Sequence, residues 1–129
     1  MLQMARVVSH IQQNYTRQVS VTELAKLAHL SPSQFQRRFR KIYNVAPMQY
    51  INNVRIHAAC EMLKDQNNSV SQIAHATGFA TSAYFCAMFK RHMGETPSAF
   101  RQRLGYLTPT VNALSSLATD SGEHASVIE

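Results

Sequence analysis

Two stretches of the chain, LSPSQFQRRFRK at residues 30–41 and FATSAYFCAMFKR at residues 79–91, repeat one pattern, and this repeat decides the fold. Each stretch places two Phe residues four apart and follows them with a basic pair. The offset is 49 before the turn (Val21 to Val70) and 50 after it (Phe35 to Phe85), which implies one extra residue in the second turn. The matched positions are Val21, Leu24, Ala25, Leu30, Phe35, Phe39, Arg40, Lys41 and Pro47 against Val70, Ile73, Ala74, Phe79, Phe85, Phe89, Lys90, Arg91 and Pro97.

Capping residues mark where the helices of both copies begin. Ser20-Val21-Thr22-Glu23 and Ser69-Val70-Ser71-Gln72 have the capping-box pattern, in which the first and fourth residues satisfy each other's backbone N–H groups. Ser31-Pro32-Ser33-Gln34 adds proline at the first helical position, Thr96-Pro97 is similar, and Ala46-Pro47 lacks the capping side chain. With the apolar spacing, these signals predict an all-α fold of seven helices, at residues 3–15, 21–28, 32–43, 47–64, 70–77, 82–93 and 97–104.

The short connectors predict two helix-turn-helix units, at about residues 21–43 and 70–93. Between them, residues 47–64 form a linker helix about 27 Å long. With the half-widths of the units added, their separation approaches one turn of DNA, about 34 Å. The mixed surface of the linker favours a partly exposed rod over the interior of a single bundle, since it includes Asn52, Asn53, Arg55 and Glu61.

Charge is distributed unevenly along the chain. The formal net charge is +6, but all thirteen Lys and Arg and only four acidic residues precede residue 107, so that residues 1–106 carry +9. A body this basic favours a polyanionic partner. We therefore interpret residues 1–106 as one DNA-binding domain and residues 107–129 as a loosely ordered tail, with a short helix around 111–117 as the alternative.

The first copy presents a face rich in hydrogen-bond donors. Successive helical residues are about 100° apart, so Phe35, Phe39 and Ile42 form the buried stripe of helix 32–43. Arg can address guanine bidentately, Gln can address adenine, and cations can hold phosphates. An ordinary solvated face is the alternative, but the second helix of a helix-turn-helix is the one that enters the major groove. The predicted DNA-contacting residues of this copy are Ser33, Gln34, Gln36, Arg37, Arg40 and Lys41.

The second copy has lost the long polar side chains from its base-reading positions. The same projection buries Phe85, Phe89 and His92. Small side chains can approach thymine methyl groups, while the basic pair can hold phosphates. We expect helix 32–43 to recognise bases strongly and helix 82–93 to recognise them weakly and mainly to position the domain. The predicted contacts of the second helix are Ser82, Ala83, Cys86, Ala87, Lys90 and Arg91.

No catalytic or metal-binding motif is visible in the sequence. The six His residues form no His-x-x-x-His pair, and no Gly-rich phosphate loop or nucleophile elbow occurs, so we expect neither an enzyme nor a cofactor. The two Cys residues, Cys60 and Cys86, suggest neither a disulfide framework nor zinc, which favours a reducing cytoplasm. No membrane span or secretory signal is apparent.

Residues 78–101, GFATSAYFCAMFKRHMGETPSAFR, resemble the signature of the AraC/XylS family of bacterial transcription regulators. The resemblance covers roughly residues 3–104. It implies a seven-helix domain that binds promoter DNA and usually activates transcription with RNA polymerase. It also implies base contacts from Ser33, Gln36 and Arg37 of the first unit and from Ser82, Ala83, Cys86 and Ala87 of the second. Family members often carry Arg where this chain has Ala87, which puts base reading by the second unit in doubt.

Most relatives in this family also carry an amino-terminal effector-binding or dimerisation domain. This chain begins almost directly in the first helix, so we expect an excised DNA-binding half of a larger regulator, with a small standalone regulator as the alternative. Two other functions stay open: a protein-interaction module that contacts RNA polymerase with incidental DNA affinity, and a repair protein with a reactive Cys. Cys86 lacks the Pro-Cys-His setting expected of such a nucleophile.

Overall fold

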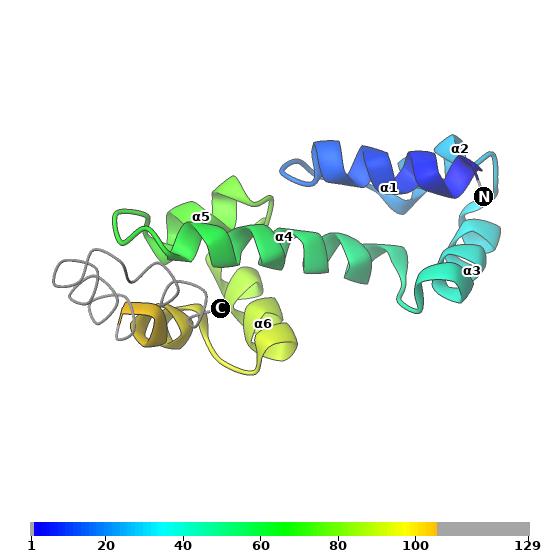
Figure 1. Cartoon of the computed structure of the whole chain (residues 1–129). Coiled ribbons are helices and arrows are strands. Elements are labelled where there is room, and N and C mark those ends of the chain that lie inside the picture. Colours follow the sequence, from blue (N-terminus) through cyan, green and yellow to red (C-terminus); the bar gives the residue numbers. More distant parts are fainter. Residues whose placement is uncertain (1, 106–129) are drawn as a thin grey trace, which may run out of the picture.

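A computed structural model describes residues 2–105 of the chain, and within this range every regular element is a helix. Figure 1 shows a long central helix with shorter helices grouped around its two halves. The elements are α1 (Leu2–Asn14), α2 (Val21–Leu27), α3 (Pro32–Tyr43), α4 (Pro47–Leu63), α5 (Val70–Ala76), α6 (Ser82–Met93) and a seventh helical segment at 97–105. The all-α prediction with seven helices is confirmed. The predicted tail, 107–129, lies outside the described residues, and so does its alternative helix.

Two of the three predicted capping boxes are complete. Ser31 Oγ accepts from the Gln34 N–H at 3.2 Å while the Gln34 side chain accepts from the Ser31 N–H at 3.3 Å. Ser69 and Gln72 make the same pair at 3.0 and 2.8 Å. The prediction was wrong for Ser20: its hydroxyl caps the Glu23 N–H, but the carboxylate of Glu23 turns instead to His10 and Arg17. A cationic partner thus wins over the neutral backbone donor.

The repeat extends to the backbone conformation of the turns. His29 and Gly78 both have positive φ, 59° and 97°, at the turn inside each helix-turn-helix. Asn44 and Gly94 both end their helices in the left-handed conformation and donate to carbonyls one turn back, at 2.8 Å in each case. Such positions favour Gly or Asn. The extra residue of the second unit is Ala80, which separates Phe79 from the cap Thr81.

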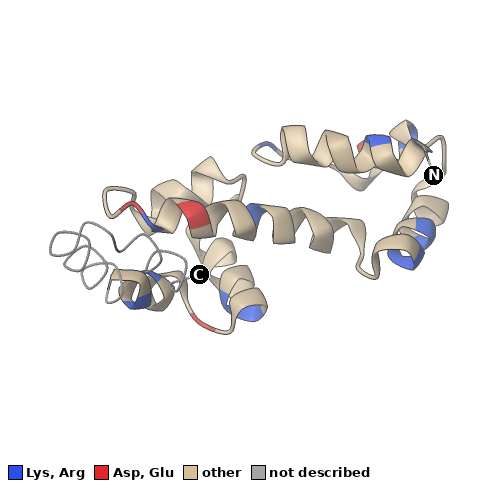
Figure 2. Cartoon of the chain, in the orientation of Figure 1, with Lys and Arg blue, Asp and Glu red and all other residues tan. Residues whose placement is uncertain are grey.

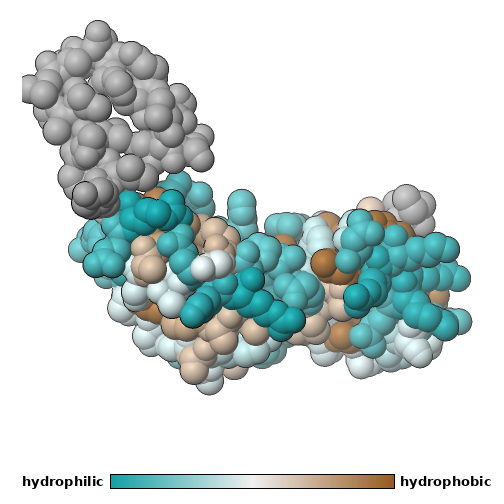
Figure 3. Space-filling model, turned by 90° about the horizontal axis from the view of Figure 1, so that it is seen from below, coloured by the Kyte–Doolittle hydropathy of each residue, from teal (hydrophilic) through white to brown (hydrophobic). Residues whose placement is uncertain are grey.

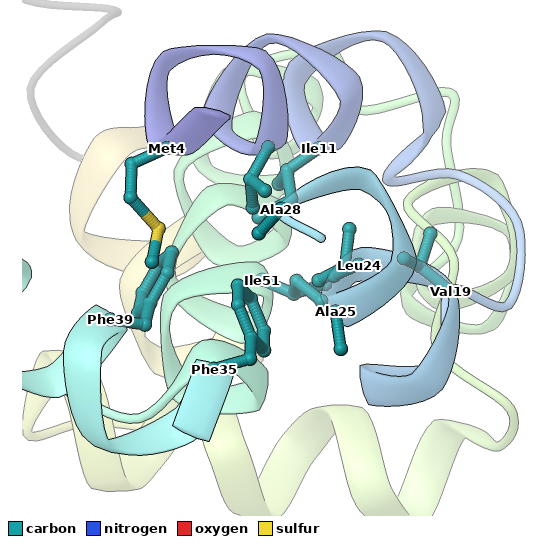
Figure 4. Packing of buried hydrophobic residues seen from close by; sticks show 10 residues of the cluster. Met4, Ile11, Val19, Leu24, Ala25, Ala28, Phe35, Phe39 and Ile51 are labelled. Atoms are coloured by element: carbon teal, nitrogen blue, oxygen red, sulfur yellow. The ribbon is translucent and has the colours of Figure 1, made fainter. Parts of the chain in front are cut away.

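Each half of the molecule has its own hydrophobic core. In the first half, α1, α2, α3 and the start of α4 pack around Phe35 and Phe39 (Figure 4). Phe39 meets Tyr50 of α4 edge to face, with ring centroids 5.4 Å apart. In the second half, Phe89 meets Phe100 in the same way at 5.5 Å, fifty residues further along the chain. The duplicated sequence therefore builds a duplicated core.

The linker helix α4 belongs to both cores. Ile51 is buried in the first core, whereas Ile56, Ala59 and Leu63 are buried in the second. Between these positions lie two polar residues that the sequence placed on an exposed surface, and this prediction was wrong, because Asn52 is 4% exposed and Arg55 is 3% exposed. The chain segment after α1 and the second helix-turn-helix cover the face that an isolated rod would leave in water.

Replacing Ser69 by Ala should lower the free energy of unfolding by about 1 kcal/mol, because the cap of α5 loses its acceptor. Thermal or urea unfolding of the purified chain measures this. Ser71→Ala is the matched control, since Ser71 is exposed within the same helix, and it should be neutral or slightly stabilising. Equal losses in both variants would contradict the capping account.

Stability should depend on Glu23 in a pH range set by its neighbours. Hydrogen bonds from Arg17 and His10 lower the pKa of Glu23 from 4.5 to about 2. A carboxylate whose pKa is lowered in the folded state stabilises the fold at pH values above its ordinary pKa. This contribution is lost as the pH falls through the pKa that the group has in the folded state. Glu23→Gln should therefore be less stable at pH 7, by less than about 1 kcal/mol for a partly exposed pair.

Unfolding measured at pH 7 and near pH 2 should show this difference shrinking toward zero. Glu61→Gln is the control, because Glu61 is exposed and its ion-pair partner within residues 2–105 is Lys64. A Glu23→Gln deficit that persisted at pH 2 would rule out the ionic cause.

Candidate nucleic-acid interface

All six predicted contact residues of α3 lie on one exposed face. Phe35 and Phe39 fix the orientation of α3, because both are fully buried. Ile42 was predicted to complete this stripe, but it is 41% exposed. In the last turn of α3 it is Tyr43 that packs on the core, with its ring centroid 4.6 Å from that of Phe39, while Ile42 lines a groove with Met4 and Leu30. The exposed face itself consists of Ser33, Gln34, Gln36, Arg37, Arg40 and Lys41.

Four of the six predicted contact residues of α6 are exposed, whereas Ser82 is half-buried and Cys86 is half-buried against the second core. Phe85 and Phe89 are buried, whereas His92 was predicted to join them and is exposed. His92 lies in the last turn of α6 and lines an open groove along α4. The exposed predicted residues are Ala83, Ala87, Lys90 and Arg91, and the half-buried ones are Ser82 and Cys86.

These two faces lie on one side of the molecule. Figure 1 shows α3 at one end of α4 and α6 below its middle, with α1 and α2 above α4. In Figure 2 the Lys and Arg of α3 lie beyond the right end of α4, and those of α6 lie below α4. Figure 3 shows the same side from below, with hydrophilic surface over α3 at the right and over the α6 region near the centre. The 17 residues of α4, about 26 Å long at 1.5 Å per residue, set the scale of this separation.

The cations on these faces have no acidic partner among residues 2–105. The ion pairs described there join Glu23 to Arg17 and His10, Glu61 to Lys64, and Glu95 to Arg103. The remaining Asp65 accepts from a backbone N–H. Neither α3 nor α6 contains an acidic residue. The positive charge left unpaired for an anionic partner comes from Arg37, Arg40, Lys41, Lys90 and Arg91.

Three other features would indicate another function for the described residues, namely a metal-binding cluster, a nucleophilic thiol and a membrane-spanning helix. Residues 2–105 contain no group of three metal-ligating side chains. Burial raises the pKa of the Cys60 thiol, which disfavours the nucleophilic thiolate. Across the same part of the chain, no helix is both long and apolar enough to cross a membrane.

The sequence matches a family model described as a helix-turn-helix domain over residues 24–103, which is more than half of the chain. This range contains both helix-turn-helix units and the signature at residues 78–101. The chain belongs to the AraC/XylS family.

Relatives and solved structures agree with membership of the AraC/XylS family. The bifunctional transcriptional activator/DNA repair enzyme AdaA of Bacillus subtilis (strain 168) is 36% identical over 96 residues, covering 74% of this chain and 46% of that protein. The raffinose operon transcriptional regulatory protein RafR of Pediococcus pentosaceus is 33% identical over 98 residues, covering 76% and 35%. The chain thus spans less than half of these relatives.

A solved structure shows the same fold together with nucleic acid. The DNA-binding domain of AdpA, in complex with a target DNA, superposes with a TM-score of 0.71 at 28% identity, covering 90% of this chain and 96% of that one. Family and fold together identify this AraC/XylS chain as the DNA-binding part of a transcription regulator.

Several residues of the AraC/XylS signature have structural roles in this chain. Gly78 forms the left-handed turn of the second unit. The hydroxyl of Tyr84 accepts from Asn52 at 3.1 Å, which ties α6 to α4. Arg101 donates to the carbonyls of Leu63 and Asp65 and so closes the end of α4. These residues of the signature therefore hold the second unit together and tie it to α4.

The sequence analysis missed the residues that connect the two halves. Arg55 donates to the backbone carbonyls of Tyr15 at 2.8 Å and Arg17 at 2.9 Å, and burial lowers the pKa of its guanidinium. Arg55 has no Asp or Glu three or four residues away on α4. The exposed Arg37 also lacks such an acidic neighbour, so this feature alone did not distinguish a buried Arg from an exposed one.

Proposed function

We propose that this chain binds double-stranded promoter DNA sequence-specifically, with α3 and α6 in two successive major grooves on one face of the duplex. The observation that carries the proposal is the set of unpaired cations and amide donors on α3 and α6, on one side of the molecule. Phosphates would supply the anionic partner that the described chain lacks. Grooves on one face recur about every 34 Å, a separation compatible with the length of α4.

In this proposal α3 is the main reader of sequence. Arg37 projects furthest from the buried Phe35 stripe and would address guanine, while Gln34 and Gln36 would address adenine and Ser33 either base. Arg40 and Lys41, in the last turn of α3, would hold phosphates and fix the register.

The second reader would mainly position the domain. Ser82, Ala83, Cys86 and Ala87 allow a close approach to the groove and contact with thymine methyl groups. Lys90 and Arg91 would hold phosphates from the end of α6. Because Ala87 cannot form hydrogen bonds to a base edge, this half of the site should tolerate more sequences than the half read by α3.

We further propose that the regulator activates transcription in contact with RNA polymerase, in the bacterial cytoplasm at the nucleoid. The name of the AdaA relative, a transcriptional activator, supports this direction of control. Because the relatives are more than twice as long as the part that matches, we propose that an effector-binding or dimerisation domain precedes this one in the whole protein. The repair activity in AdaA's name is not part of the proposed function, because burial raises the pKa of the Cys60 thiol and Cys86 has no Pro-Cys-His setting.

In vitro selection from random duplex DNA, followed by footprinting, tests the proposal directly. The expected result is one enriched sequence, with protection in two neighbouring major grooves on the same face. The half protected by α3 should be the more strongly conserved among selected molecules. Affinities equal to those for shuffled DNA at the same salt concentration would overturn the proposal.

Replacing Arg37 by Ala should weaken binding to the selected site by about 1–3 kcal/mol and relax the preference at one or two base pairs. The matched control is Arg38→Ala. Arg38 carries the same charge on the same helix but lines a groove beside Met4 and Ala28 at the side of α1.

The control should weaken all sequences slightly and equally, because it removes only a general electrostatic attraction. Binding measured by fluorescence anisotropy on the selected and shuffled duplexes separates the two effects. A uniform loss for Arg37→Ala, with no change in preference, would show that Arg37 contacts phosphate and not a base.

A further inference from the structure

A narrow polar seam joins the two halves of the domain beside α4. The segment after α1 lies against Arg55, whose guanidinium donates from Nε to the Tyr15 carbonyl and from Nη2 to the Arg17 carbonyl. Arg55 also contacts the second helix-turn-helix. Its guanidinium carbon lies 5.8 Å from the centre of the Phe79 ring. One side chain therefore touches an element of each half.

The turn of the second unit approaches the same segment closely. The Gly78 carbonyl accepts from Gln18 Nε2 at 3.2 Å. A Cβ atom at Gly78 would overlap the carbonyl oxygen of Tyr15 and lie 2.8 Å from Arg55 Nε. Only a residue without a side chain fits between these groups. Residues 15–18 and the turn at 78–79 thus share a single contact region with Arg55 at its centre.

The chemistry of Arg55 makes this contact sensitive to position. A nearly buried guanidinium normally needs hydrogen-bond acceptors, and in the described part of the chain these are two backbone carbonyls and no carboxylate. Both bonds require residues 15–17 to stay where they are, since a shifted loop would leave a buried cation without acceptors. Because the guanidinium of Arg55 is planar and donates from two nitrogens, it fixes the orientation of residues 15–17 relative to α4 as well as their distance from it.

The loop is in turn continuous with the core that orients α3. Ile11 precedes the loop and Val19 follows it, and both are buried with Phe35 and Phe39. Any rotation of α3 relative to α4 would therefore carry the loop away from Arg55. On the other side of the seam, Asn52 of α4 donates to Tyr84 at the beginning of α6.

We propose that Arg55 is a positioning residue that sets the separation and relative orientation of α3 and α6, by holding residues 15–17 of the first half against the second helix-turn-helix. It contacts no base in this scheme. Its effect is to make the domain select DNA by the spacing between its two half-sites. This inference rests on the proposed function.

The test uses the site selected from random DNA and duplexes in which one or two base pairs are added or removed between the two protected grooves. Each added pair shifts and rotates one half-site relative to the other. The wild-type chain should prefer the original spacing by about tenfold or more, because the second contact is lost when geometry forbids simultaneous engagement.

Arg55→Lys keeps the charge but lacks the planar guanidinium that donates in two directions. In this variant the preference for the original spacing should fall to about threefold or less. Gln18→Ala removes the bond to Gly78 from an exposed position, so it tests the same seam without a buried change and should also reduce the preference. Gln13→Ala, an exposed change on α1, is the control and should keep the wild-type ratio.

A duplex that contains only the α3 half-site provides a second measurement. At low salt, Arg55→Lys and Gln18→Ala should each bind this half-site duplex with an affinity within about twofold of the wild-type chain, because α3 itself is unchanged. An equal loss on this duplex and on the full site would overturn the inference, since it would indicate damage to the first unit and not to the spacing.

The two proposals fail in different ways. If the wild-type chain protects a single groove or shows no preferred sequence, the proposed function fails, and the role of Arg55 fails with it. If the wild-type chain protects two grooves but Arg55→Lys and Gln18→Ala keep its full spacing preference, the proposed function stands and only the positioning role is overturned.

Discussion

The arrangement of the two halves depends on one buried guanidinium that has no carboxylate partner among residues 2–105. Arg55 takes its acceptors from the backbone of the segment after α1, 40 and 38 residues earlier in the chain. Each hydrophobic core is complete without the other, and α4 is the element that they share. Apolar packing orients α3 and α6 within their own halves. The hydrogen bonds of the seam are directional, so they fix the orientation of one half relative to the other. Hydrophobic packing is non-directional and fixes that orientation less well.

Duplication explains both what the halves share and where they differ. The left-handed turns, the N-terminal caps and the edge-to-face aromatic pairs recur at matching positions, because each copy must build the same small core. The solvent-facing positions are free of that requirement. There the first copy carries Gln and Arg, and the second carries Ala and Cys. The buried pattern thus fixes the orientation of each helix, while the exposed pattern decides how each would contact DNA.

Local signals in the sequence predicted the helices, because caps, prolines and Phe spacing act within a few residues. The same signals failed where distant segments meet. Glu23 gave up its capping-box bond for Arg17 and His10, and Asn52 and Arg55 were placed on an exposed surface that the loop after α1 covers. Ile42 and His92 satisfied the helical projection, but both are exposed, and in the last turn of α3 the core contact is made by Tyr43. The exposure of the six candidate residues of α3 and of four on α6 was predictable from their place opposite buried Phe residues, whereas Ser82 and Cys86 are half-buried.

The central claim is that the two halves form one rigid unit before DNA binds. Pulsed dipolar spectroscopy on nitroxides attached through Arg38→Cys and His92→Cys, with Cys60→Ala and Cys86→Ala to remove the native thiols, measures the distance between α3 and α6 in the free chain. The account predicts a single narrow distance distribution that stays unchanged when the selected DNA is added. A broad or two-peaked distribution that narrows only on DNA would show that the duplex, and not the seam around Arg55, sets the arrangement.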